Sequence, residues 1–334
     1  PPLLAIISSC AAGLIGDDIE AIARGAGLSC PIAVLDSSGL TGSFADGWDK
    51  AACAVLSAFT PEQRSGQANA VNLIGMTSAY YNGENDAHEL MRLLALAGYR
   101  VNAVLGCAMS AADLSGLTQA SLNIVVHDEL GGGAARLLAE TCGMFCIAPL
   151  PPYGRAGTRE WLAEIGRVLP APCADAAQEE ITRVTREDFL RINECKSIWG
   201  ELRYDTAVIR APRSAAWGLA QALRTEWADV CHLAVAAETK GAQETMGIAD
   251  EILSEMDAMR MQELLSCMED GLLLGSSNES AHIHPQRTQY LAVSYPVQDV
   301  LQLTDNPFMG LRGARYIEET LWNGSILRRK ILLS

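Results

Sequence analysis

Short apolar runs alternate with helical patterns along nearly the whole chain, and this alternation most constrains the fold. Apolar runs such as Leu3–Ile7, Val71–Met76 and Leu122–Val126 are each followed by a turn and a stretch with helical spacing. Strands that alternate with helices are typical of parallel sheets whose strands are joined through crossover helices. The pattern therefore predicts an α/β protein with parallel sheets, built from three strand–helix units.

The same pattern predicts the other elements. We expect further strands at Pro31–Leu35, Val101–Leu105, Met144–Ala148, Thr206–Ala211, Val230–Ala236 and Gly271–Ser277. We expect helices at about 17–24, 46–58, 85–97, 132–141, 158–168, 176–200, 214–224 and 310–328. Thr158 is a reasonable N-cap for its helix. The polar stretch at residues 60–70 indicates a domain boundary.

Composition excludes several classes of protein. The 334 residues are 49% hydrophobic and 19% charged, which indicates a globular chain with a sizeable core. The net charge of −15 argues against nucleic acid or an anionic membrane as a partner. No signal peptide is visible, and no apolar run reaches the ~18 residues of a membrane-spanning helix.

Ten cysteines at irregular spacing suggest a reducing cytoplasm rather than a disulfide framework. Cys142 and Cys146 are interpreted as core thiols at a helix end and in the following strand. The chain begins at Pro1 without a methionine and enters a strand at once. We therefore expect that an N-terminal segment is missing from this sequence.

Cys10 is the leading candidate for a functional residue. It follows the first strand, a turn with Gly13 and Gly16 comes next, and a helix opens at Asp17 and Asp18. Backbone N–H groups and the positive end of a helix dipole favour thiolate over thiol at such a position. A rigidly held thiolate suits an iron–sulfur cluster. The alternative is a buried cysteine before an aspartate N-cap, and both aspartates are interpreted as helix caps rather than acid–base catalysts.

Other motifs are less specific. The glycines Gly131–Gly133 open a helix after a strand, but they form neither G-x-G-x-x-G nor a P-loop, so nucleotide binding is disfavoured. No G-x-S-x-G nucleophile motif and no HExxH metal motif is present. His282 and His284 would share a face of a strand and could bind a metal, although a solvated loop is the favoured interpretation.

The segment Cys10–Ala21 resembles the C-x-x-x-[LI]-I-G-D-D-[IL]-x-A signature of the nitrogenase component 1 family. In that family the cysteine is a ligand of the interfacial iron–sulfur cluster. Further segments are similar to the family in the family's order. Residues 42–51 resemble its G-S-x-x-x-G-W-D stretch, and residues 71–76 and 84–114 its central domain. Residues 148–165 resemble its P-x-G-x-x-x-T-x-x-[FW]-L motif, residues 272–280 its G-N-S strand end, and residues 295–323 its closing segment. The resemblance covers essentially the whole chain.

The chain also departs from the family's pattern. Gly39, with Ser38 beside it, stands where the nitrogenase β subunit has a serine near the cluster. Ser276 replaces the Asn of G-N-S, and Leu311 replaces the aromatic of G-Y-x-G. The Cys and His that hold the active-site metal cofactor in the α subunit have no counterpart. These differences argue against an ordinary nitrogenase β subunit.

The resemblance implies three Rossmann-like domains with parallel sheets around a cleft, the first of them incomplete at its N-terminus. Residues 1–68 would form the first domain and be completed by residues 286–334. Residues 69–170 would form the second domain and residues 171–285 the third.

The resemblance also implies a β-type subunit of a cytoplasmic, anaerobic nitrogenase-like reductase. Cys10 would be the metal ligand, and Gly13 and Gly16 would adjoin an interfacial [8Fe-7S] or [4Fe-4S] cluster. The partners would be an α-type subunit carrying the catalytic site, in an α2β2 heterotetramer, and an ATP-dependent iron protein that donates electrons. The substrate would be dinitrogen or another small molecule such as a methylthio-alkane, and the family also reduces tetrapyrrole rings.

Two alternatives stay open: a non-catalytic scaffold for nitrogenase cofactor assembly, and a metal-free α/β binding protein. A cluster at an interface further predicts that this chain alone exposes an apolar surface.

Overall fold

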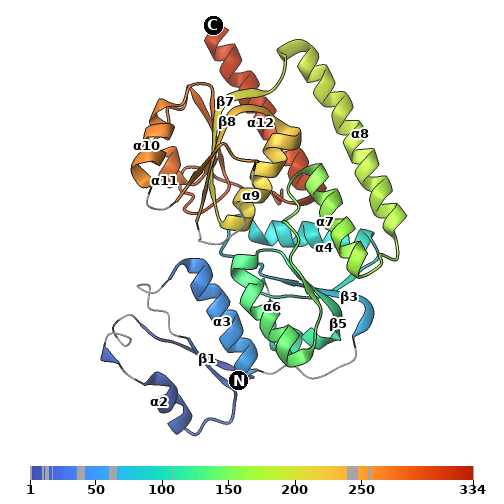
Figure 1. The fold of residues 1–334 in the computed structure, drawn as a ribbon, viewed down its shortest axis with the longest axis vertical. Coiled ribbons are helices and arrows are strands. Elements are labelled where there is room, and N and C mark those ends of the chain that lie inside the picture. Colours follow the sequence, from blue (N-terminus) through green and yellow to red (C-terminus); the bar gives the residue numbers. More distant parts are fainter. Residues whose placement is uncertain are drawn as a thin grey trace. The chain divides into compact units, whose positions relative to one another are not determined.

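The computed structural model describes residues 2–9, 11, 15–16, 18–35, 42–59, 66–107, 109–238, 247–254 and 257–333. Within these residues the strands form parallel sheets connected through helices, as the alternating pattern predicts (Figure 1). The chain divides into two compact units. The first comprises Pro1–Thr77 and Gly98–Pro149, and the second comprises Ser78–Ala97 and Leu150–Ser334.

The first unit holds two parallel sheets. In the first sheet β1 (Leu4–Ile7) pairs with β2 (Ile32–Leu35), accompanied by α2 (Ile19–Gly25) and α3 (Phe44–Ala58). The second sheet has the order β4-β3-β5-β6. Its strands are β3 (Gln67–Ile74), β4 (Arg100–Val104), β5 (Ala120–Val125) and β6 (Cys146–Ile147), and its helices are α5 (Ala111–Ser115), η1 (Leu117–Gln119) and α6 (Asp128–Cys142).

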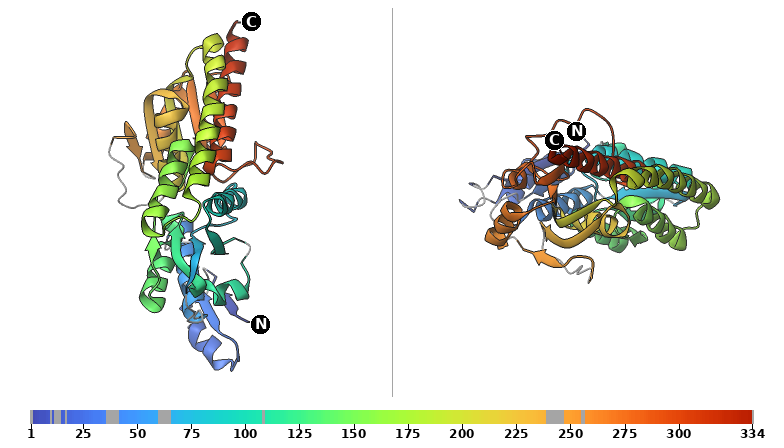
Figure 2. Two further views of the ribbon diagram at one scale, coloured as in Figure 1. Left: turned by 90° about the vertical axis from the view of Figure 1, so that its right-hand side faces the viewer. Right: turned by 90° about the horizontal axis from the view of Figure 1, so that it is seen from above.

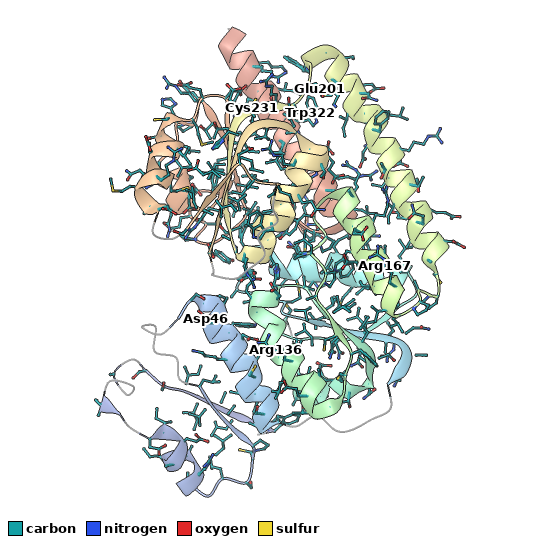
Figure 3. The ribbon with its side chains drawn as sticks, in the orientation of Figure 1. Asp46, Arg136, Arg167, Glu201, Cys231 and Trp322 are labelled. Atoms are coloured by element: carbon teal, nitrogen blue, oxygen red, sulfur yellow. The ribbon has the colours of Figure 1, made fainter. Side chains whose placement is uncertain are left out.

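The packing of α3 against α6 forms the core of the first unit. Leu56 of α3 and Leu138 of α6 belong to one buried cluster with residues of β3, β4 and β5. Ser43 and Asp46 form a reciprocal capping box that starts α3, and Figure 3 shows Asp46 at this helix end. Cys146 is half-buried against the same core and its thiol contacts the carbonyl of Ala135, which agrees with its interpretation as a core thiol.

A row of buried asparagines crosses the second sheet. The side-chain amide of Asn102 on β4 donates to Asn72 on β3 at 2.9 Å, and Asn72 donates to Asn123 on β5 at 2.8 Å. Asn72 and Asn123 are fully buried in an otherwise apolar sheet. A shift of one residue in strand register would break these bonds, so the row restricts how the three strands align.

The second unit contains one sheet of order β11-β10-β7-β8-β9. Its strands are β7 (Arg203–Ala211), β8 (Asp229–Ala237), β9 (Glu251–Leu253), β10 (Gly271–Gly275) and β11 (Thr288–Ala292). Its helices are α4 (Gly83–Leu96), α7 (Gly154–Val168), α8 (Ala174–Trp199), α9 (Arg213–Ala222), the π-helical turn η2 (Leu223–Trp227), α10 (Ala258–Cys267), α11 (Ser277–Ser280) and α12 (Gly310–Leu333).

The start of α7 differs from the expectation. The helix begins at Gly154, and Thr158 lies inside it, where its hydroxyl donates to the Gly154 carbonyl at 2.6 Å. The expected cap at Thr158 is wrong because the carboxylate of Glu226, on η2, accepts from the N–H groups of Arg155 and Ala156. A carboxylate from a distant segment therefore replaces the local cap.

A buried carboxylate also holds the start of α12. Asp86 on α4 accepts from the N–H groups of Phe308 and Met309 at 2.6 and 2.8 Å, directly before α12 begins. Helix α12 packs against α4, α7, α8 and β11 of this unit, and Figure 2 shows α8 and α12 side by side. The domain boundaries expected from the resemblance stay a prediction.

We predict that Asp86 makes stability depend on pH. Burial raises the pKa of Asp86 from 3.8 to about 7. The two N–H bonds lower the pKa, but their effect is smaller than that of burial. Between these values the folded state keeps a proton that the unfolded state has lost. The free energy of unfolding should therefore fall as pH rises, by up to about 1.4 kcal/mol per pH unit.

Urea unfolding of the wild type and Asp86→Asn between pH 5 and 8 checks this prediction. The difference in unfolding free energy between the two proteins should shrink as pH rises, because only the wild type carries the titrating carboxyl. Burial lowers the pKa of His127 to about 4, which gives the opposite slope, but this contribution is common to both proteins and cancels on subtraction. Parallel curves for the two proteins would contradict the prediction.

Candidate functional site

The strand expected before Cys10 and the helix expected after it are present as β1 and α2. β1 pairs with β2 in parallel, and the pairing continues where the N–H of Ser8 donates to the carbonyl of Leu35 at 2.8 Å. Asp18 caps α2 by accepting from the N–H of Ala21 at 2.9 Å, which confirms its interpretation as a helix cap. Cys10, with Gly13, Asp17, Ser38 and Gly39, lies outside the described residues.

Of the two glycines expected beside a cluster, Gly16 is the one that the structure describes. Its φ of +78° is in the left-handed region, which favours glycine, and a Cβ added there would meet no atom within 4 Å. The turn before α2 is thus open on the side of Gly16. An open glycine turn leaves its backbone accessible to a bound group.

Apolar side chains around this turn are exposed. Ile7 and Ile15, on either side of Cys10 in the chain, are 67% and 75% exposed, and Ile22 and Phe44 are also more than half exposed. A sheet of two strands buries little apolar surface by itself. The first unit therefore presents the apolar surface that an interfacial site predicts.

The G-W-D stretch fastens α3 to α6. The carboxylate of Asp49 accepts from the backbone N–H groups of Gly133 at 2.9 Å and Ala134 at 3.2 Å. Burial raises the pKa of Asp49, while these N–H bonds lower it. No local pattern indicates this pairing, because the two segments are more than eighty residues apart.

The glycines expected to open a helix lie inside α6, because this helix already begins at Asp128, so that expectation is wrong. They serve close packing instead. A Cβ on Gly131 would lie 2.8 Å from the Cα of Gly75, which follows β3, and one on Gly133 would lie 2.2 Å from the carboxylate of Asp49. The space in which these glycines could have cradled a phosphate is therefore filled by the chain itself. This agrees with the expectation that the segment binds no nucleotide.

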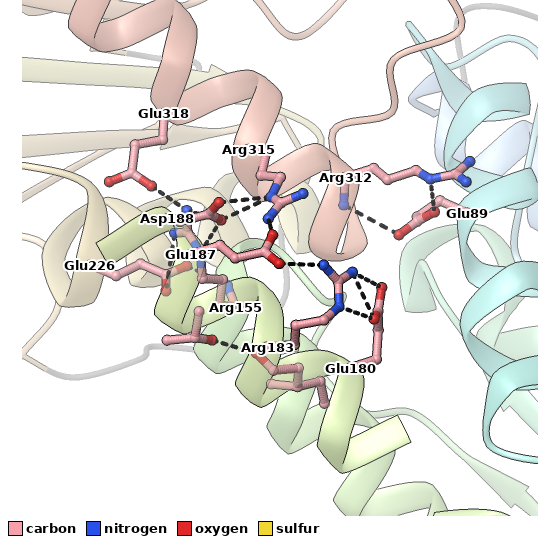
Figure 4. A network of polar contacts seen from close by, with 12 residues as sticks. Glu89, Arg155, Glu180, Arg183, Glu187, Asp188, Glu226, Arg312, Arg315 and Glu318 are labelled. Carbon is pink, nitrogen blue, oxygen red and sulfur yellow. Dashed lines mark hydrogen bonds and ion pairs between the residues drawn. The ribbon is translucent and has the colours of Figure 1, made fainter. Parts of the chain in front are cut away.

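A buried ion network joins four elements of the second unit (Figure 4). Arg155 of α7 pairs with Asp188 of α8 at 2.8 Å and with Glu318 of α12 at 2.6 Å. Arg315 pairs with the same Asp188 at 2.8 Å, and Glu226 lies 4.0 Å from Arg155. Burial raises the pKa of Glu226 and of Glu318, while the charge of Arg155 lowers both.

A cavity of about 450 Å³ lies over this network, and the polar residues Arg155, Glu226 and Glu318 line it. Aromatic side chains, among them Trp227 and Trp322, complete the lining, and Figure 3 marks Trp322 on α12. Because its buried carboxylates are already paired with Arg155, the cavity has a structural explanation for its charges and no evident chemistry.

The two histidines considered as metal ligands are not brought into a metal site. His282 is exposed in the turn after α11, and His284 follows in the loop to β11. Across the described part of the chain, no three His, Cys, Asp or Glu side chains are grouped so that they could hold a metal ion. No helix in that part combines the length and apolar character needed to cross a membrane.

Residues 1–324 match the model of the family described as nitrogenase component 1 type oxidoreductase. The B subunit of light-independent protochlorophyllide reductase from Acidiphilium rubrum is 25% identical over 334 residues, covering 96% of this chain and 64% of the relative. The corresponding B subunit from Chloroflexus aurantiacus strain J-10-fl is 23% identical over 337 residues, covering 96% and 61%. The chain thus spans about three fifths of the length of these curated relatives.

Solved structures show the same fold. The structure described as nitrogenase Cp1 at pH 6.5 has a TM-score of 0.77 and 14% identity, covering 97% of this chain and 75% of that one. Nitrogenase Cp1 at pH 5 has a TM-score of 0.75 and 19% identity, covering 97% and 70%. The likeness confirms the expected α/β architecture with parallel sheets.

Two neighbouring glycines of α6 test the packing by Asp49. Gly133→Ala should displace Asp49 from its N–H partners and lower the free energy of unfolding by about 1–3 kcal/mol. The matched variant Gly132→Ala, whose Cβ would meet only Arg136 at 3.6 Å, should raise it by up to about 1 kcal/mol through helix propensity. Urea unfolding measures both, and equal effects would contradict the packing role.

Two arginines of α7 test the ion network. Arg155→Met leaves buried carboxylates without their cation and should cost about 3–5 kcal/mol of unfolding free energy. Arg167 pairs with Glu160 on the surface, so Arg167→Met should cost about 0–1 kcal/mol. Thermal and urea unfolding compare the two variants. A cost for Arg155→Met as small as that for Arg167→Met would mean that the buried pairs contribute little.

Proposed function

Because this chain belongs to the nitrogenase component 1 type oxidoreductase family, we propose that it is the β-type subunit of a nitrogenase-like reductase. In this proposal the subunit receives electrons from an ATP-dependent iron protein. It passes them through an interfacial iron–sulfur cluster to a catalytic site in an α-type partner. The family match over residues 1–324 is the observation that carries the proposal.

Cys10 is the residue that would hold the cluster, with Gly13 and Gly16 beside it. The described residues fit such a role, because a paired strand ends just before Cys10 and a capped helix begins just after it. The left-handed turn at Gly16 has open space on the side where a Cβ would stand, which supports close approach of a bound group. When bound, an iron–sulfur cluster supplies one-electron transfer.

A subunit interface would bring further ligands to Cys10. Iron–sulfur clusters of either proposed type need several thiolates, and Cys10 contributes one. The exposed Ile7, Ile15 and Phe44 support burial of this region against an α-type subunit, since a partner surface would cover apolar groups that now face water. Burial would also exclude water from the cluster, which helps to set its potential.

ATP is assigned to the iron protein rather than to this chain. A phosphate site needs free N–H groups at a glycine-rich helix start. In this chain the glycine-rich segment of α6 packs on Gly75 and donates to the carboxylate of Asp49. No P-loop sequence is present.

The names of the relatives favour one class of substrate. Those matching 96% of this chain are B subunits of light-independent protochlorophyllide reductase, which supports reduction of a conjugated ring system of the tetrapyrrole type. Dinitrogen and methylthio-alkanes are the other candidates. A scaffold for cofactor assembly is the alternative from a different class, because a scaffold binds a cluster and hands it on without turnover.

Replacement of single cysteines tests the proposal. The chain is co-expressed anaerobically with its α-type partner, and iron, acid-labile sulfide and the EPR spectrum are measured per heterodimer. Cys10→Ala should fold and lose the interfacial iron and its EPR signal. Cys30→Ala is the matched control, because Cys30 is a half-buried free thiol of the same sheet region and its loss should leave the iron unchanged.

The outcomes separate the candidates. Full iron occupancy in Cys10→Ala would overturn the ligand assignment, and no iron in a well-folded wild-type complex would favour the metal-free binding protein. Turnover with the iron protein and ATP then distinguishes a reductase from a scaffold. A cluster that is present but never reoxidised by any substrate would favour the scaffold.

A further inference from the structure

The sheet of the second unit has a topological switch point beside its central strand. From β7 the chain passes through α9 to β8 and then to β9, on one side of β7. It then returns through α10 to β10, which pairs with β7 on the other side. Figure 1 shows α9 and α10 on opposite faces of this sheet. In open parallel sheets, ligands bind outside the carboxyl ends of strands at such a reversal.

A cavity of about 280 Å³ lies at this point, and we name it the switch-point pocket. Arg210 lines it from the end of β7, Asn278 and His282 from the segment after β10, and Met261 and Leu265 from α10. Arg210 is two residues beyond Val208, which packs against α10, so strand alternation directs both side chains to the same face.

Arg210 has no anionic partner among the described residues. Other arginines of this unit, such as Arg155, Arg224 and Arg315, bond carboxylates or carbonyls, but no hydrogen bond or ion pair engages the guanidinium of Arg210 in the described part of the chain. The carboxylate in the described lining is that of Glu279, whose Oε2 accepts from the N–H and hydroxyl of Ser276 at 2.9 and 2.6 Å. Within the described residues, the half-buried guanidinium therefore has no anion that balances its charge.

We propose that the switch-point pocket binds a small organic acid, whose carboxylate pairs with Arg210. The planar guanidinium matches a carboxylate with two parallel N–H bonds. Met261 and Leu265 provide an apolar wall for the carbon skeleton, and the amide of Asn278 provides a further hydrogen-bond donor. The volume is just below that of pockets for drug-sized ligands, so a compact acid fits best.

The remaining groups exclude other ligands. Glu279 and the net charge of −15 oppose any anion, and they oppose a polyphosphate, which carries several charges, more strongly than a carboxylate. A metal ion finds no group of three suitable side chains among the described residues. The proposal is independent of Cys10 and of the electron-relay function, since it rests on residues of the second unit alone.

Calorimetric titration with succinate tests the proposal on the purified complex, with inorganic phosphate as the second probe. The wild type should bind succinate, and Arg210→Gln should weaken binding about ten- to hundredfold, the loss expected for a charge-assisted pair. Arg287→Gln is the matched control. Arg287 lies directly before β11, is exposed and pairs with Glu269. Its replacement removes the same charge at a position outside the pocket and should leave the affinity for succinate unchanged.

A second variant guards against misfolding. If Arg210→Gln proves unstable, Ala258→Phe takes its place as the test. This variant fills the pocket without altering charge and should abolish succinate binding. Absence of succinate binding to the wild type would overturn the proposal. Equal weakening of succinate binding in Arg210→Gln and Arg287→Gln would show a general charge effect and would overturn the proposed pairing with Arg210. Binding of phosphate but not of succinate would overturn the proposal that the ligand is an organic acid.

Discussion

Carboxylates that bind backbone N–H groups of distant helices hold this structure together. Asp49 of α3 binds α6, Asp86 of α4 binds the residues before α12, and Glu226 of η2 binds the start of α7. Each pairing joins segments that are at least seventy residues apart. A hydrogen bond to a charged group contributes about 1.5–3 kcal/mol, and an unsatisfied buried N–H would cost a similar amount. Packing of these helices therefore depends on three acidic side chains.

These pairings also restrict where the protein can bind ligands. The start of α7 is occupied by the carboxylate of Glu226 and cannot accept a phosphate. The glycines of α6 lie inside that helix and bring backbones together. Two other regions are the candidates for binding. One is the strand end near Cys10, with its open turn at Gly16 and exposed Ile7 and Ile15. The other is the carboxyl end of β7, where Arg210 faces a cavity.

The two regions suit different tasks for the same physical reason. In a parallel sheet the carboxyl ends of the strands meet at one edge, where loops and helix starts bring polar groups together. In the first sheet region the side chains of Ile7 and Ile15 are exposed, which suits contact with a partner subunit. In the sheet of the second unit, residues of α10 and the carboxyl end of β7 line a small polar pocket, which suits a compact ligand. Family membership supports the redox task of the first region, while the pocket follows from geometry alone.

The sequence by itself determined the parallel α/β class, the family, the candidate ligand Cys10 and most of the strands and helices, although β9 and β11 were not predicted. Local patterns suffice for these, because hydrophobic periodicity and a short signature lie within about twenty neighbouring residues. Only the tertiary structure decided that Asp49 and Glu226 hold helices α6 and α7, that Thr158 is no cap, and that Arg210 lines a pocket. Those facts depend on which distant side chains meet, and a sheet's strand order, not its local sequence, decides that.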